Sequence, residues 1–141
     1  MSFLNYIFKT KKPTPRSKTV FIVEDNSTYA QALKIFLKSN FPELQEVKIF
    51  PVGEVAEMEL DQDPAVIIMD YFLDSKYNDA ETGLEAVKHI RSKKPETNIM
   101  FLSSQDNIDI ALEATKKYKC YYVKKDDRAF RRVEEYIRGV L

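Results

Sequence analysis

Short apolar runs alternate with segments of helical periodicity along most of the chain. Five runs have the length and the Val, Ile and Phe content of β-strands. Four are continuously apolar, as expected for strands covered on both faces, whereas the second carries Lys48 and precedes Pro51, which suits a sheet edge. The predicted strands are Val20–Val23, Val47–Phe50, Ala65–Met69, Ile99–Leu102 and Cys120–Val123.

Between these strands, apolar residues recur at the 3.6-residue spacing of helices with one face on a core. Two further helices are predicted at 53–60 and 81–93, although Gly53 and the acidic run 57–63 weaken the first pattern. Strands alternating with helices predict βα units, and right-handed crossovers place the helices on both faces of a parallel sheet. The clearest stripes are Tyr29, Ala32, Leu33, Phe36 and Leu37, then Ile108, Ala111, Leu112 and Thr115, then Phe130, Val133, Ile137 and Val140.

Length indicates the number of domains, and the distribution of charge indicates which ligands the protein is suited to bind. The 141 residues are enough for one ordinary domain. The net charge is zero, but the first eighteen positions hold five basic residues and no acid, so residues 19–141 carry 17 basic and 22 acidic side chains. This balance argues against a nucleic-acid-binding surface on the folded body, because phosphate backbones are bound by clustered Lys and Arg. An acidic body suits a site for a divalent cation.

The N-terminal segment, residues 1–17, is predicted to be a flexible leader and linker, with the folded domain at 18–141. Its charges follow its apolar residues, which is the wrong order for a secretory signal. Phe3, Leu4, Ile7 and Phe8 share helical spacing, so a short helix that docks on a membrane surface or a partner is the alternative.

Two further features indicate a cytoplasmic protein. No apolar run approaches the roughly 18 residues of a membrane span. Cys120 is the single cysteine, cannot form an internal disulfide and adjoins an apolar run, so we expect a reduced thiol in the core.

Polar side chains follow the carboxyl ends of four predicted strands, which is where open parallel sheets bind ligands. Carboxylate oxygens are ligands that Mg²⁺ prefers, and a carboxylate can also attack phosphorus to form an acyl phosphate. That reaction needs positioning and neutralised charge more than covalent chemistry from the protein. The residues are Glu24, Asp25 and Asn26 after the first strand, Asp70 after the third, Ser103 and Ser104 after the fourth, and Lys124 and Lys125 after the fifth.

Four segments, FIVEDN, IIMDYFLD, FLSSQD and YYVKKDD, resemble in order and spacing the signature segments of response-regulator receiver domains of two-component signalling systems. The resemblance covers about residues 18–141. It implies a flavodoxin-like receiver fold: a doubly wound α/β protein with a five-stranded parallel sheet in the order 2-1-3-4-5. It further implies phosphorylation by a histidine kinase or a phosphotransfer protein with Mg²⁺ as cofactor.

The resemblance also assigns roles residue by residue. Glu24 and Asp25 match the acidic pair that binds the metal. Asp70 matches the phosphoacceptor and third carboxylate ligand, and the backbone carbonyl of Phe72 matches a further metal ligand. Ser103 matches the hydroxyl that contacts the phosphoryl group and takes part in the switch.

The remaining roles concern the fifth strand. Tyr122 matches the switch aromatic, and the family spacing of three from aromatic to lysine selects Lys125 as the lysine that pairs with phosphate. Lys124 remains the alternative, with Tyr121 as the aromatic. Because neighbouring strand residues point in opposite directions, only one of the two lysines is expected to face the site.

Two departures from the family pattern affect the surroundings of the site. Thirteen positions separate Asp70 from Gly83, which makes a long loop at 71–82 in place of a short one containing Pro and then Gly. No Pro follows the lysine pair.

The resemblance implies a signalling receiver rather than an enzyme, one that catalyses only its own phosphoryl transfer and autodephosphorylation. Output is expected by contact with an unidentified protein, through the helix near 108–115, the fifth strand and the helix near 130–140. One alternative is a receiver-like docking module that is not phosphorylated. The other is a metal-dependent phosphohydrolase using an aspartyl phosphate, but such enzymes place an acid two positions after the nucleophile, where this chain has Phe72.

Overall fold

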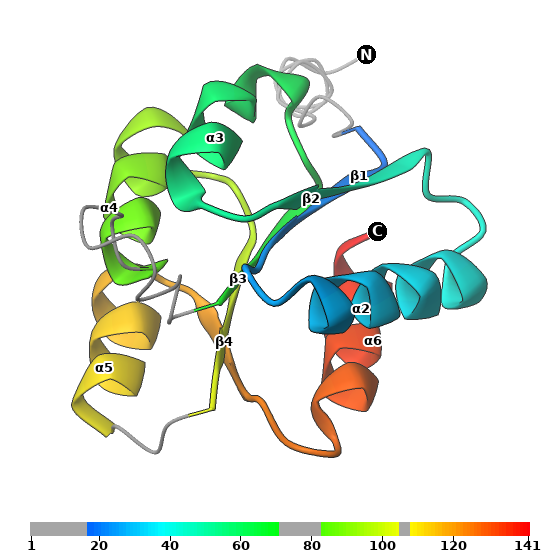
Figure 1. Ribbon diagram of the computed structural model, residues 1–141. Coiled ribbons are helices and arrows are strands. Elements are labelled where there is room, and N and C mark those ends of the chain that lie inside the picture. The colour runs from blue at the N-terminus through cyan, green and yellow to red at the C-terminus, as the bar shows by residue number, and fades with distance from the viewer. Residues whose placement is uncertain (1–16, 71–82, 105–107) are drawn as a thin grey trace, which may run out of the picture.

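The computed structural model describes residues 17–70, 83–104 and 108–141 and contains one five-stranded parallel sheet (Figure 1). The strand order is β2-β1-β3-β4-β5, which confirms the predicted fold and order. The strands are β1 (Thr19–Val23), β2 (Glu46–Phe50), β3 (Val66–Asp70), β4 (Ile99–Ser103) and β5 (Tyr121–Lys124).

Helices cover both faces of this sheet (Figure 1). Helices α2 and α6 lie on one face, and α3, α4 and α5 lie on the other. A short 3₁₀ helix, η1, follows α3, and a short π-helix, η2, follows α5. The bounds are α2 (Ser27–Asn40), α3 (Gly53–Met58), η1 (Leu60–Gln62), α4 (Gly83–Lys93), α5 (Ile108–Leu112), η2 (Glu113–Lys117) and α6 (Ala129–Val140).

Alternate residues of the central strands supply two separate cores, because successive side chains of a strand point to opposite faces. Val20 and Ile22 of β1 pack with Leu33 of α2 and Val133 of α6. Their neighbours Phe21 and Val23 pack on the other face, with residues of α3 and α4. Burial on both faces explains why β1, β3 and β4 are apolar except at one terminal residue each, Thr19, Asp70 and Ser103.

Both outer strands, β2 and β5, are edge strands. The prediction for β2 is therefore confirmed. The expectation that the fifth strand is covered on both faces is wrong, since Tyr121 is exposed and Tyr122 is half-buried. Its apolar composition reflects ring stacking: Tyr121 lies 4.6 Å from Tyr136 of α6, and Tyr122 lies 6.2 Å from Phe101, measured between ring centroids.

The helix predicted over 108–115 ends earlier than its apolar stripe suggests. Regular α-helix stops at Leu112, and η2 continues as a π-helical turn in which the amide of Tyr118 donates to the carbonyl of Glu113. The Thr115 hydroxyl donates to the Ala111 carbonyl at 2.8 Å, a side-chain bond that competes with regular helix geometry. The prediction for 53–60 is likewise shortened, because α3 ends at Met58 and a 3₁₀ turn follows.

Several predictions concern residues outside the described ranges. The predicted leader up to residue 16 and the predicted long loop 71–82, with Phe72, fall there, so the boundary between leader and domain stays a prediction. Ser17 belongs to the described part, and its hydroxyl lies 2.8 Å from the carbonyl oxygens of both Gln62 and Asp63. None of the helices in the described part is long and apolar enough to cross a bilayer.

Arg91 of α4 holds together the end of the domain opposite the carboxyl ends of the strands. Its guanidinium donates to the carbonyls of Tyr118 at 2.7 Å, of Pro95 at 3.3 Å and of Lys119 at 3.4 Å, and also to that of Thr97. These carbonyls belong to two separate connections, the one before β4 and the one before β5. A planar fork of donors can satisfy them together, which an ammonium cannot do.

We expect Arg91→Ala to lower the free energy of unfolding by about 2–3 kcal/mol, because it leaves several carbonyls without their charged donor. Urea unfolding measures the loss. Arg131→Ala is the matched control, since Arg131 is 82% exposed and pairs with the exposed Glu135 one turn away, and the loss is expected to stay below about 0.5 kcal/mol. Equal losses in the two variants would contradict the role given to Arg91.

Candidate functional site

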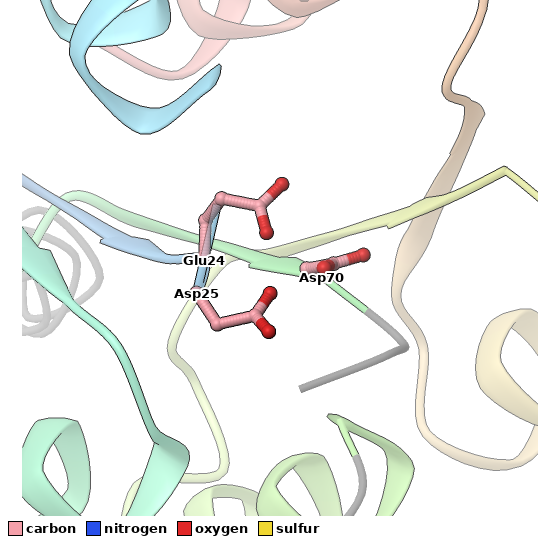
Figure 2. A group of neighbouring side chains, drawn as sticks. All are labelled: Glu24, Asp25 and Asp70. Atoms are coloured by element: carbon pink, nitrogen blue, oxygen red, sulfur yellow. The ribbon is translucent and has the colours of Figure 1, made fainter. Parts of the chain in front are cut away.

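Three carboxylates meet at the carboxyl edge of the sheet. Glu24 and Asp25 directly follow β1, and Asp70 is the last residue of β3 (Figure 2). One carboxylate oxygen from each lies within 4.8 Å of the others. Glu24 and Asp70 are buried, whereas Asp25 is half-buried. The structure therefore brings together the three acidic residues singled out in the sequence, because neighbouring parallel strands end at the same edge.

Backbone hydrogen bonds hold Glu24 in this position. Its amide donates to the carbonyl of Phe50 at 2.9 Å, and its Oε2 accepts from the amide of Asn26 at 3.2 Å. The Asn26 side chain in turn accepts from the amide of Tyr29 at 3.0 Å and caps α2. A continuous hydrogen-bonded segment thus links the acidic pair to the first turn of α2.

Lys125 places its ammonium among these carboxylates. Nζ forms an ion pair with Oε1 of Glu24 and lies 3.7 Å from Oδ2 of Asp70. The Lys125 side chain is only 18% exposed, so solvent screens these contacts weakly. Its amide donates to the carbonyl of Ser103 at 2.8 Å, which joins the ends of β4 and β5. Lys124, the alternative candidate, has an exposed side chain.

Burial and crowding shift the pKa values of the acids. Burial, with the hydrogen bond and the negative charge of Glu24, raises the pKa of Asp70 to about 8. Burial also acts to raise the pKa of Glu24, but hydrogen bonds from Asp70 and Lys125 and the charge of Lys125 outweigh it and lower that pKa. Burial and the neighbouring acid therefore disfavour the ionised form of Asp70.

The donor set fits a divalent cation of the magnesium type. Mg²⁺ takes hard oxygen ligands and binds through a few carboxylates together with water and phosphate oxygens. Asp25, Glu24 and Asp70 offer such oxygens, and the ammonium of Lys125 balances only part of their combined negative charge. Burial raises the pKa of Asp70 most, and this excess of negative charge adds to the effect; a cation would offset the contribution of the charge.

The two predicted switch residues lie on neighbouring strands. Ser103 is the last residue of β4 and is 2% exposed. Tyr122 of β5 is half-buried, with its ring stacked on Phe101 at an interplanar angle of 18°. Tyr122 lies opposite Phe101 in the pairing of β4 with β5. Ser103, two residues further along β4, lies opposite Lys124.

One residue at the site was not singled out as functional in the sequence. The sequence pattern places Tyr29 in the apolar stripe of α2, yet its ring faces the Lys125 ammonium at 4.2 Å from the centroid. Burial and the nearby charges of Glu24, Asp70 and Asp126 raise the pKa of Tyr29 to about 12, so it remains a neutral phenol. No local pattern in the sequence identifies it, because its place at the site depends on where the Lys125 side chain lies.

Many solved structures have the same fold, and three of them are described here by their similarity to this chain. A CheY-like response regulator receiver domain protein from Methanospirillum hungatei has a TM-score of 0.72 at 16% identity, covering 87% of this chain and 92% of its own. The phosphorylated cyanobacterial phytochrome response regulator RcpA has a TM-score of 0.68 at 22% identity, covering 88% and 91%. The response regulator TrrA from Thermotoga maritima, in complex with Mg(2+)-BeF, has a TM-score of 0.65 at 21% identity, covering 87% and 98%. At these identities the similarity establishes the fold.

Sequence comparison gives the family. No curated protein sequence matches significantly. The family model described as response regulator receiver domain matches residues 20–135, which is most of the chain and includes the acidic pair, Asp70, Ser103 and Lys125. With the strand order and the cluster of acids at the carboxyl edge, this match shows that the chain belongs to the response regulator receiver domain family.

Proposed function

We propose that this receiver domain accepts a phosphoryl group on Asp70 from a histidine kinase or phosphotransfer protein, with Mg²⁺ as cofactor. The observation that carries the proposal is the joining of three carboxylates from the ends of β1 and β3 with the ammonium of Lys125. An acceptor, a metal-binding pair and a countercharge are what transfer to a carboxylate requires.

Each residue has one task in the transfer. The Asp70 carboxylate attacks phosphorus, so the P–N bond to the histidine of the donor breaks as a P–O bond to Asp70 forms. Glu24 and Asp25, with the backbone carbonyl of Phe72, would hold Mg²⁺ together with Asp70. The ion supplies neutralisation of the charge on the phosphoryl oxygens. Lys125 pairs with one of these oxygens and the Ser103 hydroxyl donates to another.

Phosphorylation is proposed to act through Ser103 and Tyr122, by shifting an equilibrium between two arrangements of the edge formed by β4 and β5. The output face consists of α5, β5 and α6. It includes the exposed Tyr121 stacked on Tyr136, and Leu112, which is 43% exposed. A protein partner contacting these side chains would detect the state of Tyr122 on the same strand.

Incubation with acetyl phosphate, followed by intact-mass spectrometry, tests the proposal. We expect the wild-type protein to gain the mass of one phosphoryl group when Mg²⁺ is present and none after chelation. A receiver-like docking module would gain none under either condition. A phosphohydrolase would instead release phosphate from simple phosphate esters over many turnovers.

Asp25→Asn is expected to weaken Mg²⁺ binding and phosphoryl uptake together. It removes a ligand charge while the Glu24 contact to the Asn26 amide remains. At a magnesium concentration about 100 times its Kd, binding stabilises the wild-type fold by about 2.7 kcal/mol, and this gain should largely disappear in the variant. Thermal unfolding with and without Mg²⁺ measures it. An unchanged magnesium response would contradict the assignment of Asp25.

Phe72 and Gln105, two positions after Asp70 and Ser103, are predicted from the sequence to flank the route of the hydrolytic water; both lie outside the described residues. A phenyl ring cannot orient water by hydrogen bonding, so Phe72→Asn is expected to shorten the lifetime of the phosphorylated state. Decay of the phosphoprotein after removal of the donor measures this. A native phosphoprotein that decays as fast as the variant would refute the prediction.

A further inference from the structure

The geometry points to Tyr29 as a positioning residue for Lys125, whose aromatic face holds the ammonium beside the phosphoacceptor. This inference deepens the proposed function and rests on the role given there to Lys125. Ring-face contacts with a cation are favourable when the ammonium lies within about 6 Å of the ring centroid. The 4.2 Å separation between Lys125 Nζ and the Tyr29 centroid is well inside that range.

The position of the Tyr29 ring is fixed from both ends. Its amide donates to the capping side chain of Asn26, whose own amide contacts Glu24 of the acidic pair. Its ring meets Phe130 of α6 edge to face, at 5.5 Å between centroids and 73° between planes. Phe130 in turn lies 5.2 Å from Phe36 on the next turns of α2. The aromatic cluster formed by Tyr29, Phe36 and Phe130 therefore connects α2 to α6 and ends at the Lys125 ammonium.

The hydroxyl of Tyr29 does not account for its place at the site. It is buried and has no hydrogen-bond partner among the described residues. Burying a hydroxyl without a partner is unfavourable, so the residue is explained by its ring. Leucine would fill much of the same space without a π face, whereas phenylalanine would keep that face and remove the unpaired group.

A positioning contact of this kind suits a lysine that must exchange partners. Before phosphorylation, the Lys125 ammonium pairs with the carboxylates of Glu24 and Asp70. The proposed function requires it to pair with a phosphoryl oxygen afterwards. A lysine side chain has a flexible stem, and its charge is a point with no fixed direction. The ring face can hold the ammonium in either arrangement as long as Nζ stays over the face and within about 6 Å of the centroid. Tyr29 thereby limits the loss of side-chain freedom that each phosphorylation would otherwise cost.

Three variants of the full chain separate the ring from the hydroxyl and from general packing. Tyr29→Leu removes the aromatic face, and Tyr29→Phe keeps it. Phe36→Leu is the matched control, because it removes another ring of the same cluster that contacts Phe130, whereas the ring that faces Lys125 is that of Tyr29. The probes are the affinity for beryllofluoride with Mg²⁺, as a mimic of the phosphoryl group, and the chemical shifts of the Lys125 methylene protons next to Nζ.

We expect Tyr29→Leu to weaken beryllofluoride binding by about fivefold to thirtyfold and to abolish the upfield ring-current shift of the Lys125 methylene protons. Tyr29→Phe should keep both properties of the wild type, and Phe36→Leu should lose stability without losing either. The inference is overturned if Tyr29→Leu binds as well as the wild type, if Tyr29→Phe binds as weakly as Tyr29→Leu, or if Phe36→Leu is equally impaired. Failure of the wild type itself to bind beryllofluoride would contradict the proposed function, while the proton shifts would still decide whether the ring holds Lys125.

Discussion

Asp70→Asn is expected to take up no phosphoryl group from acetyl phosphate and, without Mg²⁺, to be more stable than the wild type by about 1–2 kcal/mol near pH 8. The first effect follows from loss of the attacking carboxylate. The second follows from removing one of three acids whose oxygens lie within 4.8 Å of one another. Intact-mass spectrometry measures the uptake, and urea unfolding measures the stability.

The pH dependence of this stability difference has a definite sign. Burial and Glu24 raise the pKa of Asp70 to about 8 in the folded protein, against about 3.9 for an unperturbed Asp. The stabilising contribution is therefore complete below about pH 4 and is lost as the pH rises through about 8. We expect the advantage of Asp70→Asn to grow over this interval and to shrink when Mg²⁺ is added. An advantage that is the same at pH 5 and pH 8 would contradict the crowding of charge described here.

Lys125→Ala is expected to lose the structural response to phosphorylation, whereas Lys124→Ala keeps it. The Lys125 ammonium already lies 3.7 Å from Asp70, while the Lys124 side chain is exposed. A charge-assisted bond to a phosphoryl oxygen contributes about 1.5–3 kcal/mol, so beryllofluoride binding should weaken by about tenfold or more in Lys125→Ala. Amide shifts of β5 and α6 on addition of beryllofluoride and Mg²⁺ measure the response.

Lys124 supplies the matched control for this experiment, since it is the adjacent residue with the same charge. Loss of the response in Lys124→Ala, with Lys125→Ala unaffected, would move the pairing lysine one residue back and make Tyr121 the switch aromatic. Loss in both would indicate that the end of β5 acts as a unit.

Much of the fold follows from the arrangement of apolar positions. Strands buried on both faces must be apolar throughout, so Val20–Val23 and Ile99–Leu102 were recognisable without any partner in view. Because parallel strands end at one edge, residues that follow them had to meet, and the structure does bring Glu24, Asp25 and Asp70 together. The order of the strands came from the family resemblance, since periodicity alone does not determine which strands are neighbours.

The structure differs from the sequence-based predictions where tertiary contacts outweigh the local pattern of apolar residues. The apolar run of β5 resembles that of a central strand, but Tyr121 stays 44% exposed and stacks on the ring of Tyr136, a residue fifteen positions later. The stripe over 108–115 carries no indication that Thr115 would bond to a carbonyl and end the regular helix. The role of Tyr29 depends on where the flexible side chain of Lys125 lies, which no local pattern encodes.

The most direct test of the central claim is the location of the phosphoryl group on the chain. After reaction with acetyl phosphate and Mg²⁺, borohydride reduction converts an aspartyl phosphate to homoserine, and peptide mass spectrometry then locates the changed residue. The account predicts homoserine at position 70, dependent on Mg²⁺, with Glu24 and Asp25 unmodified. Modification at another carboxylate, or none at all in a protein that is folded and binds Mg²⁺, would contradict it.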